Sequence, residues 1–351
     1  MERTYPRTEH CCTTGLTRIG DGSHRLFKPI SSLTTRPALR YNSHTLTDTL
    51  YPLDTLWELL ALDTPSGDEG PIADWLEHWA ARVLPDARVE RLSDTVLVRR
   101  GAKPSVAVFA HIDTTGWTLG YDKQLIPIGD PSGKVGDNLR PAGRPDSGNT
   151  LTRSTDGDWK IKGKTDALPG SNWVYSDPAA QRSGEVQGPY LDNRGGVWAA
   201  LTALTHCPEI CVAFTTGEEA SGGGAMVCAR RLYETDGITQ ALISDLTWHT
   251  KHIKCGGGAA ISLRDNSLPR RRFLARVLAL AEESGLPFQR EIESSGGSDG
   301  GAIDRSGVPI DWVFIGAPEK APHTAKERVQ IADLSSMAAL LVSLVNGLSK
   351  S

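Results

Sequence analysis

The sequence predicts an α/β fold in which a mixed, largely parallel β-sheet is flanked by helices and interrupted by a small β domain. Short, continuous apolar runs at residues 106–110 and 210–214 are typical of buried central strands. Apolar residues with helical spacing follow such runs, as at 271–284 and 334–348. Residues 117–187 are instead rich in Gly, Pro, Asp and Ser, so this long segment is expected to form a separate β structure.

Length and charge limit the class of protein. A chain of 351 residues exceeds one ordinary domain, which favours a large α/β domain with an insertion, or two domains. The formal net charge of -4 argues against an extended nucleic-acid surface. No apolar run approaches the roughly 20 residues that span a bilayer. We therefore expect neither a nucleic-acid nor a membrane partner.

The cysteines and the N-terminal segment bear on location. The six cysteines lack the CxxC spacing of metal sites, and those after residue 200 lie in apolar surroundings typical of reduced thiols. This pattern favours a cytoplasmic location. Residues 1–48 mix Thr, Ser, Arg and His without a period and lack the apolar core of a secretory signal. We expect an unstructured N-terminal extension there, with a transit-like segment as the alternative.

The remaining elements follow in order from about residue 53. Helical spacing at 56–62 and 72–83 predicts two helices separated by the Pro-Ser-Gly break at 65–67. Loose alternation at 88–98 predicts an edge strand before the central strand at 106–110. Beyond the insertion, the expected elements are a helix at 197–205, strands at 210–214, 239–243, 259–263 and 308–315, and helices at 225–233, 271–284 and 334–348. A main domain is thus expected at residues 49–116 and 188–351, with the β domain at 117–187.

Two adjacent carboxylates, Glu218 and Glu219, follow the apolar run at 210–214. Acids at the end of a buried strand repel each other and are costly unless a cation or a shared proton relieves them. A second polar pair, His111 and Asp113, stands where the run at 106–110 stops. Residues two apart in a strand share a side, so Asp113 can fix the tautomer of a metal-binding imidazole. The alternative is a satisfied polar pair at a strand end.

Three further residues stand at predicted element ends. Asp192 lies at a helix entry, where its alternative role is an N-cap, Asp245 follows the strand at 239–243, and His323 follows that at 308–315. Ligands of open α/β sheets bind at the carboxyl ends of strands. Two histidines and three carboxylates match the ligands of zinc, cobalt or manganese, and one carboxylate can bridge two ions. We therefore expect two divalent metal ions, with zinc as the first expectation.

Six segments together resemble the glutamyl and deblocking aminopeptidase family of cocatalytic metallopeptidases, relatives of the zinc exopeptidases and deacylases. They are AHIDTTG (110–116), GPYLDNRGG (188–196), TTGEEASGGGA (215–225), ISDL (243–246), GGSDGGAIDRSGVP (296–309) and APHTAKE (321–327). The resemblance runs from about residue 53 to 348. It implies a zinc-exopeptidase-like fold, peptide substrates and a homo-oligomer.

The same resemblance implies a role for each candidate residue. Asp192 bridges the two ions, His111 and Asp245 complete one site, and Glu219 and His323 complete the other. Glu218 is the general base and Asp113 orients His111. The implied activity is a dinuclear-metal-dependent aminopeptidase that removes N-terminal residues from peptides, with water held between the metals as the nucleophile.

Three alternative functions stay open. A related metal-dependent amidohydrolase, deacylase or carboxypeptidase would use the same ligands. A non-catalytic metal-bound binding protein would keep the pocket, although a pure binder needs no free base such as Glu218. A serine hydrolase could use Ser298 in its G-x-S-x-G context, with His323 and Asp311 downstream. The polar segment at 289–293, which is unlike a central strand, counts against that third function.

Overall fold

The computed structural model describes residues 52–146, 148–220 and 222–350. The N-terminal extension predicted for residues 1–48 lies outside the described residues. Within these ranges the chain forms two β-sheets, with helices on both faces of the larger one. The helices are α1 (Asp54–Leu60), α2 (Gly70–Val83), α3 (Leu191–His206), α4 (Gly223–Asp236), α5 (Arg271–Ser284), α6 (Asp299–Arg305), α7 (Ile331–Leu348) and the 3-10 helix η2 (Tyr121–Lys123).

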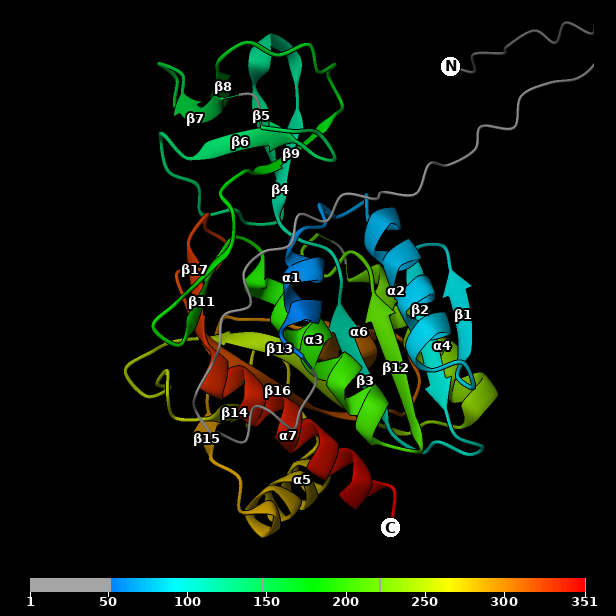
Figure 1. The fold of residues 1–351 in the computed structure, drawn as a ribbon. Coiled ribbons are helices and arrows are strands. Elements are labelled where there is room, and N and C mark those ends of the chain that lie inside the picture. Colours follow the sequence, from blue (N-terminus) through cyan, green and yellow to red (C-terminus); the bar gives the residue numbers. More distant parts are fainter. Residues whose placement is uncertain (1–51, 147, 221, 351) are drawn as a thin grey trace, which may run out of the picture. The chain divides into compact units, whose positions relative to one another are not determined.

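The larger sheet is mixed, with parallel strands at its centre (Figure 1). Its strands are β1 (Arg88–Leu92), β2 (Thr95–Arg100), β3 (Ala107–His111), β10 (Ala180–Arg182), β11 (Glu185–Gly188), β12 (Ile210–Thr215), β13 (Gln240–Trp248), β14 (Ala259–Ser262), β15 (Phe288–Glu291), β16 (Asp311–Lys320) and β17 (Glu327–Gln330). The spatial order is β1-β2-β12-β3-β13-β16-β17-β11-β10, with β14 paired to β16 and β15. Strands β12, β3, β13 and β16 are parallel, and those toward either end of this order pair antiparallel. The predicted fold class is confirmed.

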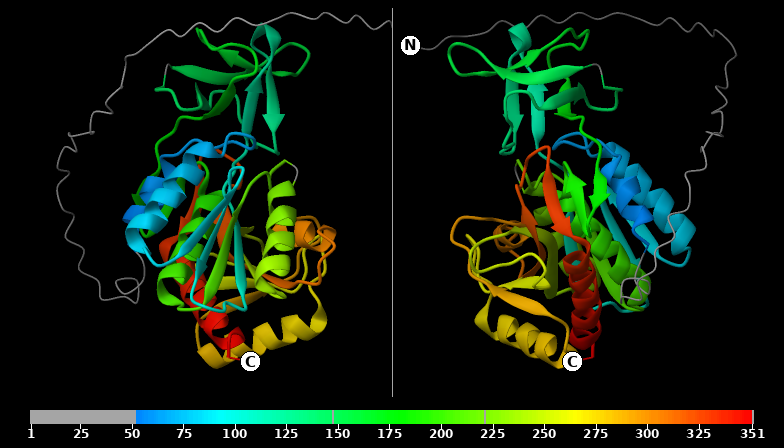
Figure 2. Two further views of the ribbon diagram at one scale, coloured as in Figure 1. Left: turned by 90° about the vertical axis from the view of Figure 1, so that its right-hand side faces the viewer. Right: turned by 60° about the vertical axis from the view of Figure 1, so that its left-hand side comes forward.

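The period of two along the strands divides the core into two layers. On β3, Val108 and Ala110 belong to one layer and Ala107 and Phe109 to the other. The first layer packs against α1, α2, α3, α5 and α7, and the second against α4 and α6. Figure 2 (left) shows α2 and α4 on opposite sides of the strands. The central strands read as continuous apolar runs because both of their faces are covered.

Helices α3 and α7 are core elements. Helix α3 contacts the central strands on one side and α1 and α7 on the other, so it presents no polar face. By length and composition alone, α7 is the one described helix that could cross a bilayer, but 61% of its apolar window is buried inside the protein. Its burial against α3 and α5 accounts for its apolar composition.

The smaller sheet forms the inserted β domain that the sequence predicts. Its strands are β4 (Gly116–Leu119), β5 (Leu125–Ile128), β6 (Asn138–Pro141), β7 (Asn149–Arg153), β8 (Trp159–Lys162) and β9 (Asn172–Tyr175), in the antiparallel order β5-β4-β9-β6-β7-β8. Trp117, Trp173 and Tyr175 lie in its own core, where Trp117 and Tyr175 meet edge to face at 4.9 Å. Strands β10 and β11, which come next in the chain, pair with the larger sheet.

Three strand predictions are wrong in detail, and one of them is the strand predicted at 308–315, which is β16 and runs from Asp311 to Lys320. Residues 88–98 form a hairpin rather than one edge strand, because Ser93 adopts a φ of 59° and turns β1 back onto β2. Strand β2 is therefore interior, between β1 and β12. The strand predicted at 239–243 continues as β13 to Trp248, since it pairs with β16 along its whole length. Asp245 accordingly lies within a strand and not beyond its end.

Candidate metal centre and substrate cavity

The candidate ligands and the candidate base line one cavity at the carboxyl end of the parallel strands. They are His111 at the end of β3, Asp192 at the start of α3, Glu218 and Glu219 after β12, Asp245 in β13 and His323 after β16. Gly217 adopts a φ of 72° in the turn that follows β12, a conformation that favours glycine. Segments far apart in the sequence thus supply a single site.

Asp192 lies between the two histidines. Its Oδ1 is 3.2 Å from His111 Nε2, and its Oδ2 is 3.6 Å from His323 Nε2. On one side His111 Nε2 is also 3.4 Å from Asp245 Oδ1, and on the other His323 Nε2 is 3.4 Å from Glu219 Oε1. Two groups of donor atoms therefore share the carboxylate of Asp192.

The alternative role of Asp192 as a helix cap is wrong. Helix α3 has Tyr190 at its N-cap position and no side-chain capping bond. Asp192 itself has a ψ of 108°, outside the helical range, and its carboxylate faces the histidines. Its backbone N–H donates to Glu327 Oε2 at 3.1 Å. The chain is thus held at the helix entry by a carboxylate from β17.

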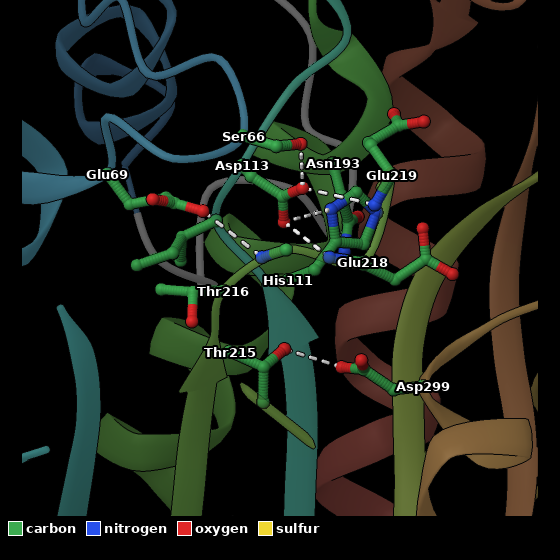
Figure 3. Close-up of polar contacts among 12 residues, drawn as sticks. Ser66, Glu69, His111, Asp113, Asn193, Thr215, Thr216, Glu218, Glu219 and Asp299 are labelled. Atoms are coloured by element: carbon green, nitrogen blue, oxygen red, sulfur yellow. Dashed lines mark hydrogen bonds and ion pairs between the residues drawn. The ribbon is translucent and has the colours of Figure 1, made fainter. Parts of the chain in front are cut away.

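Asp113 joins His111 to the turn that carries both glutamates (Figure 3). Its Oδ1 lies 3.5 Å from His111 Nδ1, within ion-pair distance but longer than an ordinary hydrogen bond, and this nitrogen has no hydrogen-bond partner among the described residues. The same carboxylate accepts the backbone N–H groups of Glu218 and Glu219, each at 3.0 Å, and the Ser66 hydroxyl at 2.6 Å. The sequence predicts the proximity of Asp113 to His111, but not the hydrogen bonds that Asp113 accepts from the backbone of Glu218 and Glu219.

His323 is oriented by the inserted β domain. Its Nδ1 is 3.0 Å from the carbonyl oxygen of Asp130 and therefore donates to it. Its own carbonyl accepts the backbone N–H of Ser132 at 2.9 Å and the Tyr175 hydroxyl at 3.2 Å. With Nδ1 engaged by Asp130, it is Nε2 that faces Asp192 and Glu219, and a cation bound there would displace its proton and take its lone pair. This is the arrangement of a metal-binding histidine.

The acids of the centre are close enough to repel one another. Burial raises the pKa of Glu218 to about 8 and that of Asp245 to about 6. Burial also raises the pKa of Glu219, and Asp192 adds to that shift. Burial opposes the ionisation of Asp192 as well, but hydrogen bonds to the two histidines outweigh it and lower the pKa. A cation at the centre would favour the ionised form of all these groups.

The residues present fit a pair of divalent cations. The ligand atoms of His111, Asp192 and Asp245 lie within 4.8 Å of one another, as do those of Asp192, Glu219 and His323. Imidazole with carboxylate oxygen suits zinc, cobalt or manganese. Beside them Glu319 is fully buried, and among the described residues neither of its carboxylate oxygens has a hydrogen-bond partner. Such an excess of buried carboxyl groups calls for positive charge.

Three further carboxylates support the centre, and sequence reasoning assigned them no role. Glu327 accepts the backbone N–H of Asp192. Figure 3 shows the other two: Glu69 accepts the backbone N–H of Gly217 at 3.1 Å, and Asp299 accepts the hydroxyl of Thr215, at the end of β12, at 2.6 Å. Asp299 lies within the segment GGSDGGAIDRSGVP and Glu327 within APHTAKE, a signal that could have identified them. Glu69 precedes α2 outside any such segment.

Ser298 has the surroundings of a helix cap and not of a nucleophile. Its hydroxyl accepts the backbone N–H of Gly300 at 3.2 Å and donates to Asp265 at 3.3 Å. No hydrogen bond joins Ser298 to His323 in the described part of the chain. Asp311, the acid of that alternative, instead pairs with Arg270 at 2.5 Å. The geometry gives no support to a serine hydrolase.

The cavity extends well beyond the candidate ligands. It has a volume of about 660 Å³. Residues 127–130 of the inserted domain form one side. Another part of the lining combines apolar side chains with polar and acidic ones: Leu246, Thr247, Trp248, Ser262, Asp265, Glu291, Glu293 and Phe314. A space of this size accepts a side chain in addition to the group that reacts.

Comparisons with known proteins identify the family of the chain. A family model described as M42 glutamyl aminopeptidase matches residues 165–340, more than half of the 351 residues. A relative from Acetivibrio thermocellus, described as a candidate aminopeptidase, is 24% identical over 326 residues, which cover 83% of this chain and 98% of the relative.

Solved structures show the same fold. Aminopeptidase APDkam598 from the archaeon Desulfurococcus kamchatkensis superposes with a TM-score of 0.74 at 18% identity, covering 85% of this chain and 94% of that one. The Pyrococcus horikoshii TET1 peptidase, which can assemble into a tetrahedron or a large octahedral shell, gives a TM-score of 0.70 at 19% identity, with coverage of 84% and 98%.

Proposed function

Because this chain belongs to the M42 glutamyl aminopeptidase family and is therefore a hydrolase acting on peptides, we propose that it removes N-terminal residues with two divalent metal ions bound around Asp192. The observation that carries the proposal is the placement of the two Asp192 oxygens, one facing His111 and the other facing His323. Zinc is the first candidate metal, with cobalt or manganese as the others.

The proposed ligand sets follow from the distances. His111, Asp192 and Asp245 would hold one ion, and Asp192, Glu219 and His323 the other. When bound, the ions would act as Lewis acids: they would polarise the scissile carbonyl group and lower the pKa of a bound water molecule to a value close to neutral pH. Asp113 and the Asp130 carbonyl would keep the imidazoles of His111 and His323 in the tautomer that offers Nε2.

Glu218 is the proposed general base. It lines the cavity beside the ligands, and its backbone is fixed by Asp113. Burial raises its pKa to about 8 in the absence of cations, and bound cations would lower that pKa, so that the carboxylate is ionised and able to accept a proton near neutral pH. It would accept a proton from the attacking water and pass it to the nitrogen of the leaving peptide. The water oxygen would first add to the carbonyl carbon, and the carbon–nitrogen bond would break once the leaving nitrogen has received that proton.

A chelation and reconstitution assay tests this function. We expect aminoacyl-anilide hydrolysis to stop when a chelator is added and to return with zinc, cobalt or manganese. Hydrolysis that is indifferent to chelation but stopped by a serine reagent would contradict the metal mechanism. Release of residues from the carboxyl end, or of acyl groups only, would instead support a carboxypeptidase or a deacylase.

Glu218→Gln separates catalysis from metal binding. We expect the variant to bind metal, as measured by elemental analysis after dialysis, but to lose at least about 100-fold in kcat, because the amide cannot accept the proton. Glu234→Gln, on the exposed face of α4, serves as the matched control and should leave both unchanged. A full rate in Glu218→Gln would exclude Glu218 as the base.

We also propose that the chain forms a homo-oligomer. The support is the structural likeness to the Pyrococcus horikoshii TET1 peptidase, whose copies assemble into closed shells. Light scattering coupled to size-exclusion chromatography measures the mass directly. A mass of 37.8 kDa at micromolar concentration would show a monomer and contradict the proposal.

A cytoplasmic location is proposed from the thiols. The four cysteines in the described ranges are free, and burial raises the pKa of Cys207 and Cys211 to about 12. Buried, unreactive thiols are compatible with a reducing compartment. Fractionation of cells that express the full chain would locate the protein, and recovery outside the cytoplasmic fraction would contradict the proposal.

A further inference from the structure

One wall of the cavity is acidic although it lies outside the candidate metal ligands. Asp265 and Glu291 line the same space as Glu218 and His323 and are only 5% and 3% exposed. Glu291 ends β15, which pairs in parallel with β14, and Asp265 follows the end of β14. The two carboxylates therefore come from neighbouring strand ends and belong to the fold itself.

These carboxylates have hydrogen bonds but no cationic partner. Glu291 accepts a hydrogen bond from the Thr247 hydroxyl, and Asp265 accepts one from the backbone N–H of Ser267 and one from the Ser298 hydroxyl. In the part of the chain that the structure describes, no lysine, arginine or histidine lies within ion-pair distance of either acid. Hydrogen bonds therefore fix the positions of both carboxylates, but no cationic side chain among the described residues neutralises their negative charge.

Burial of uncompensated acids at this wall is unfavourable. It raises the pKa of Asp265 and of Glu291, and for Glu291 the neighbouring Glu293 and Asp265 add to the shift. A cation that entered the cavity would offset this cost. Leu246, Trp248 and Phe314 line the same space, and such apolar side chains accept the aliphatic stem that carries a terminal charge.

We propose that this wall binds the side chain of the substrate's first residue and that the enzyme prefers peptides beginning with lysine or arginine. The inference rests on the proposed aminopeptidase function and names the substrate class of that same cavity. An N-terminal glutamate, the residue named in the family's description, would be repelled by Asp265 and Glu291. The preference of this chain thus differs from the family's description.

The first test compares four anilides on the metal-loaded enzyme: lysyl, arginyl, norleucyl and glutamyl. Norleucine matches the carbon stem of lysine without its ammonium group, so the lysyl to norleucyl ratio isolates the charge. We expect kcat/KM for the lysyl substrate to exceed that for the norleucyl substrate by about 30-fold or more, because only the lysyl ammonium group can form a buried ion pair with Asp265 or Glu291. A higher value for norleucyl or glutamyl substrate overturns the proposal.

The second test removes the charges. Asp265→Asn and Glu291→Gln keep the shape of each side chain and can keep the hydroxyl contacts, because a hydroxyl both donates and accepts. We expect each variant to lower the lysyl to norleucyl ratio at least about 10-fold, chiefly through KM. Glu283→Gln, an exposed acid on α5 outside the cavity, is the control and should leave the ratio unchanged.

The pattern of loss distinguishes two cationic groups of the substrate. If the acids bind the α-ammonium group, which every anilide carries, both substrates lose equally and the assignment to the side chain is overturned. A binding measurement tests the preference independently of turnover. By calorimetry, lysinamide should bind about 30-fold more tightly than norleucinamide, and equal affinity overturns the proposal even if no anilide is hydrolysed. Failure of hydrolysis with every metal would count against the aminopeptidase function alone.

Discussion

Asp113 contacts both the imidazole of His111 and the turn that carries the candidate base. One of its oxygens lies near His111 Nδ1, and the carboxylate accepts both backbone N–H groups of the glutamate turn. Asp113 is fully buried, and burial alone would raise its pKa. The nearby imidazole and the backbone N–H groups outweigh burial and lower the pKa. A single carboxylate therefore sets the relative positions of a metal ligand, the base and a second ligand.

Replacing Asp113 by Asn tests this role. The amide has one acceptor oxygen, so one backbone N–H of Glu218 or Glu219 loses its partner. We expect about 1–3 kcal/mol less free energy of unfolding and about 10–100-fold weaker metal binding, measured by denaturant titration and calorimetry. Ser66→Ala removes only the hydroxyl donor and should cost less on both measures. Equal effects of the two substitutions would contradict the positioning role.

At the scale of elements, α3 and β13 pack closely against each other at Gly196. Gly196 donates its backbone N–H to Asn193 Oδ1, Asn193 Nδ2 donates to the Ser244 carbonyl, and the Ser244 hydroxyl donates to the Gly196 carbonyl. This closed set of buried bonds fixes the residue next to Asp192 against the strand that carries Asp245. A Cβ on Gly196 would collide with the Asn193 side chain and the Ser244 carbonyl.

Gly196→Ala should therefore disturb the fold and the centre together. We expect it to lower the free energy of unfolding by about 1–3 kcal/mol through overpacking and to weaken metal binding. Gly70→Ala at the start of α2 is the matched control, since its Cβ would lie 3.9 Å from the Asp94 carboxylate, an ordinary van der Waals contact. Thermal unfolding and metal titration of both variants provide the measurement. A Gly196→Ala protein as stable as the control would show that the packing can relax.

The elements also show which features are visible in the sequence and which are not. The central strands and their helices were predictable because both faces are covered, which leaves continuous apolar runs. The ends of β13 were not predictable, since polar residues such as Asp245 continue the strand only because β16 lies alongside. Residues such as Glu69 and Asp130 support the site through single tertiary hydrogen bonds, which leave no pattern in the sequence.

At the scale of the whole molecule, buried acids link stability to pH. Burial, with Asp192 nearby, raises the pKa of Glu327 to about 8, and burial raises that of Asp299 to about 7, whereas their ordinary values are 4.5 and 3.8. At pH values between the ordinary pKa and the raised pKa of each acid, the folded chain binds more protons than the unfolded chain. The free energy of unfolding then falls as pH rises. Burial lowers the pKa of His323, but Asp192 and Glu219 outweigh burial and raise it from 6.5 to about 10. Between these two values the folded chain keeps a proton that the unfolded chain has lost, so His323 also makes the free energy of unfolding fall as pH rises.

Metal ions should reverse this trend, because their positive charge favours the ionised acids. We expect the melting temperature of chelated protein to fall between about pH 5.5 and pH 8, and the increase caused by added zinc to be larger at pH 8. Ligand present at about 1,000 times its Kd stabilises by roughly 4 kcal/mol, which gives a measurable shift. Glu327→Gln should flatten the pH dependence of the chelated protein, because the amide carries no titrating proton. A melting temperature of chelated protein that rises over this pH range would show that the buried acids near Asp192 are already compensated within the chain.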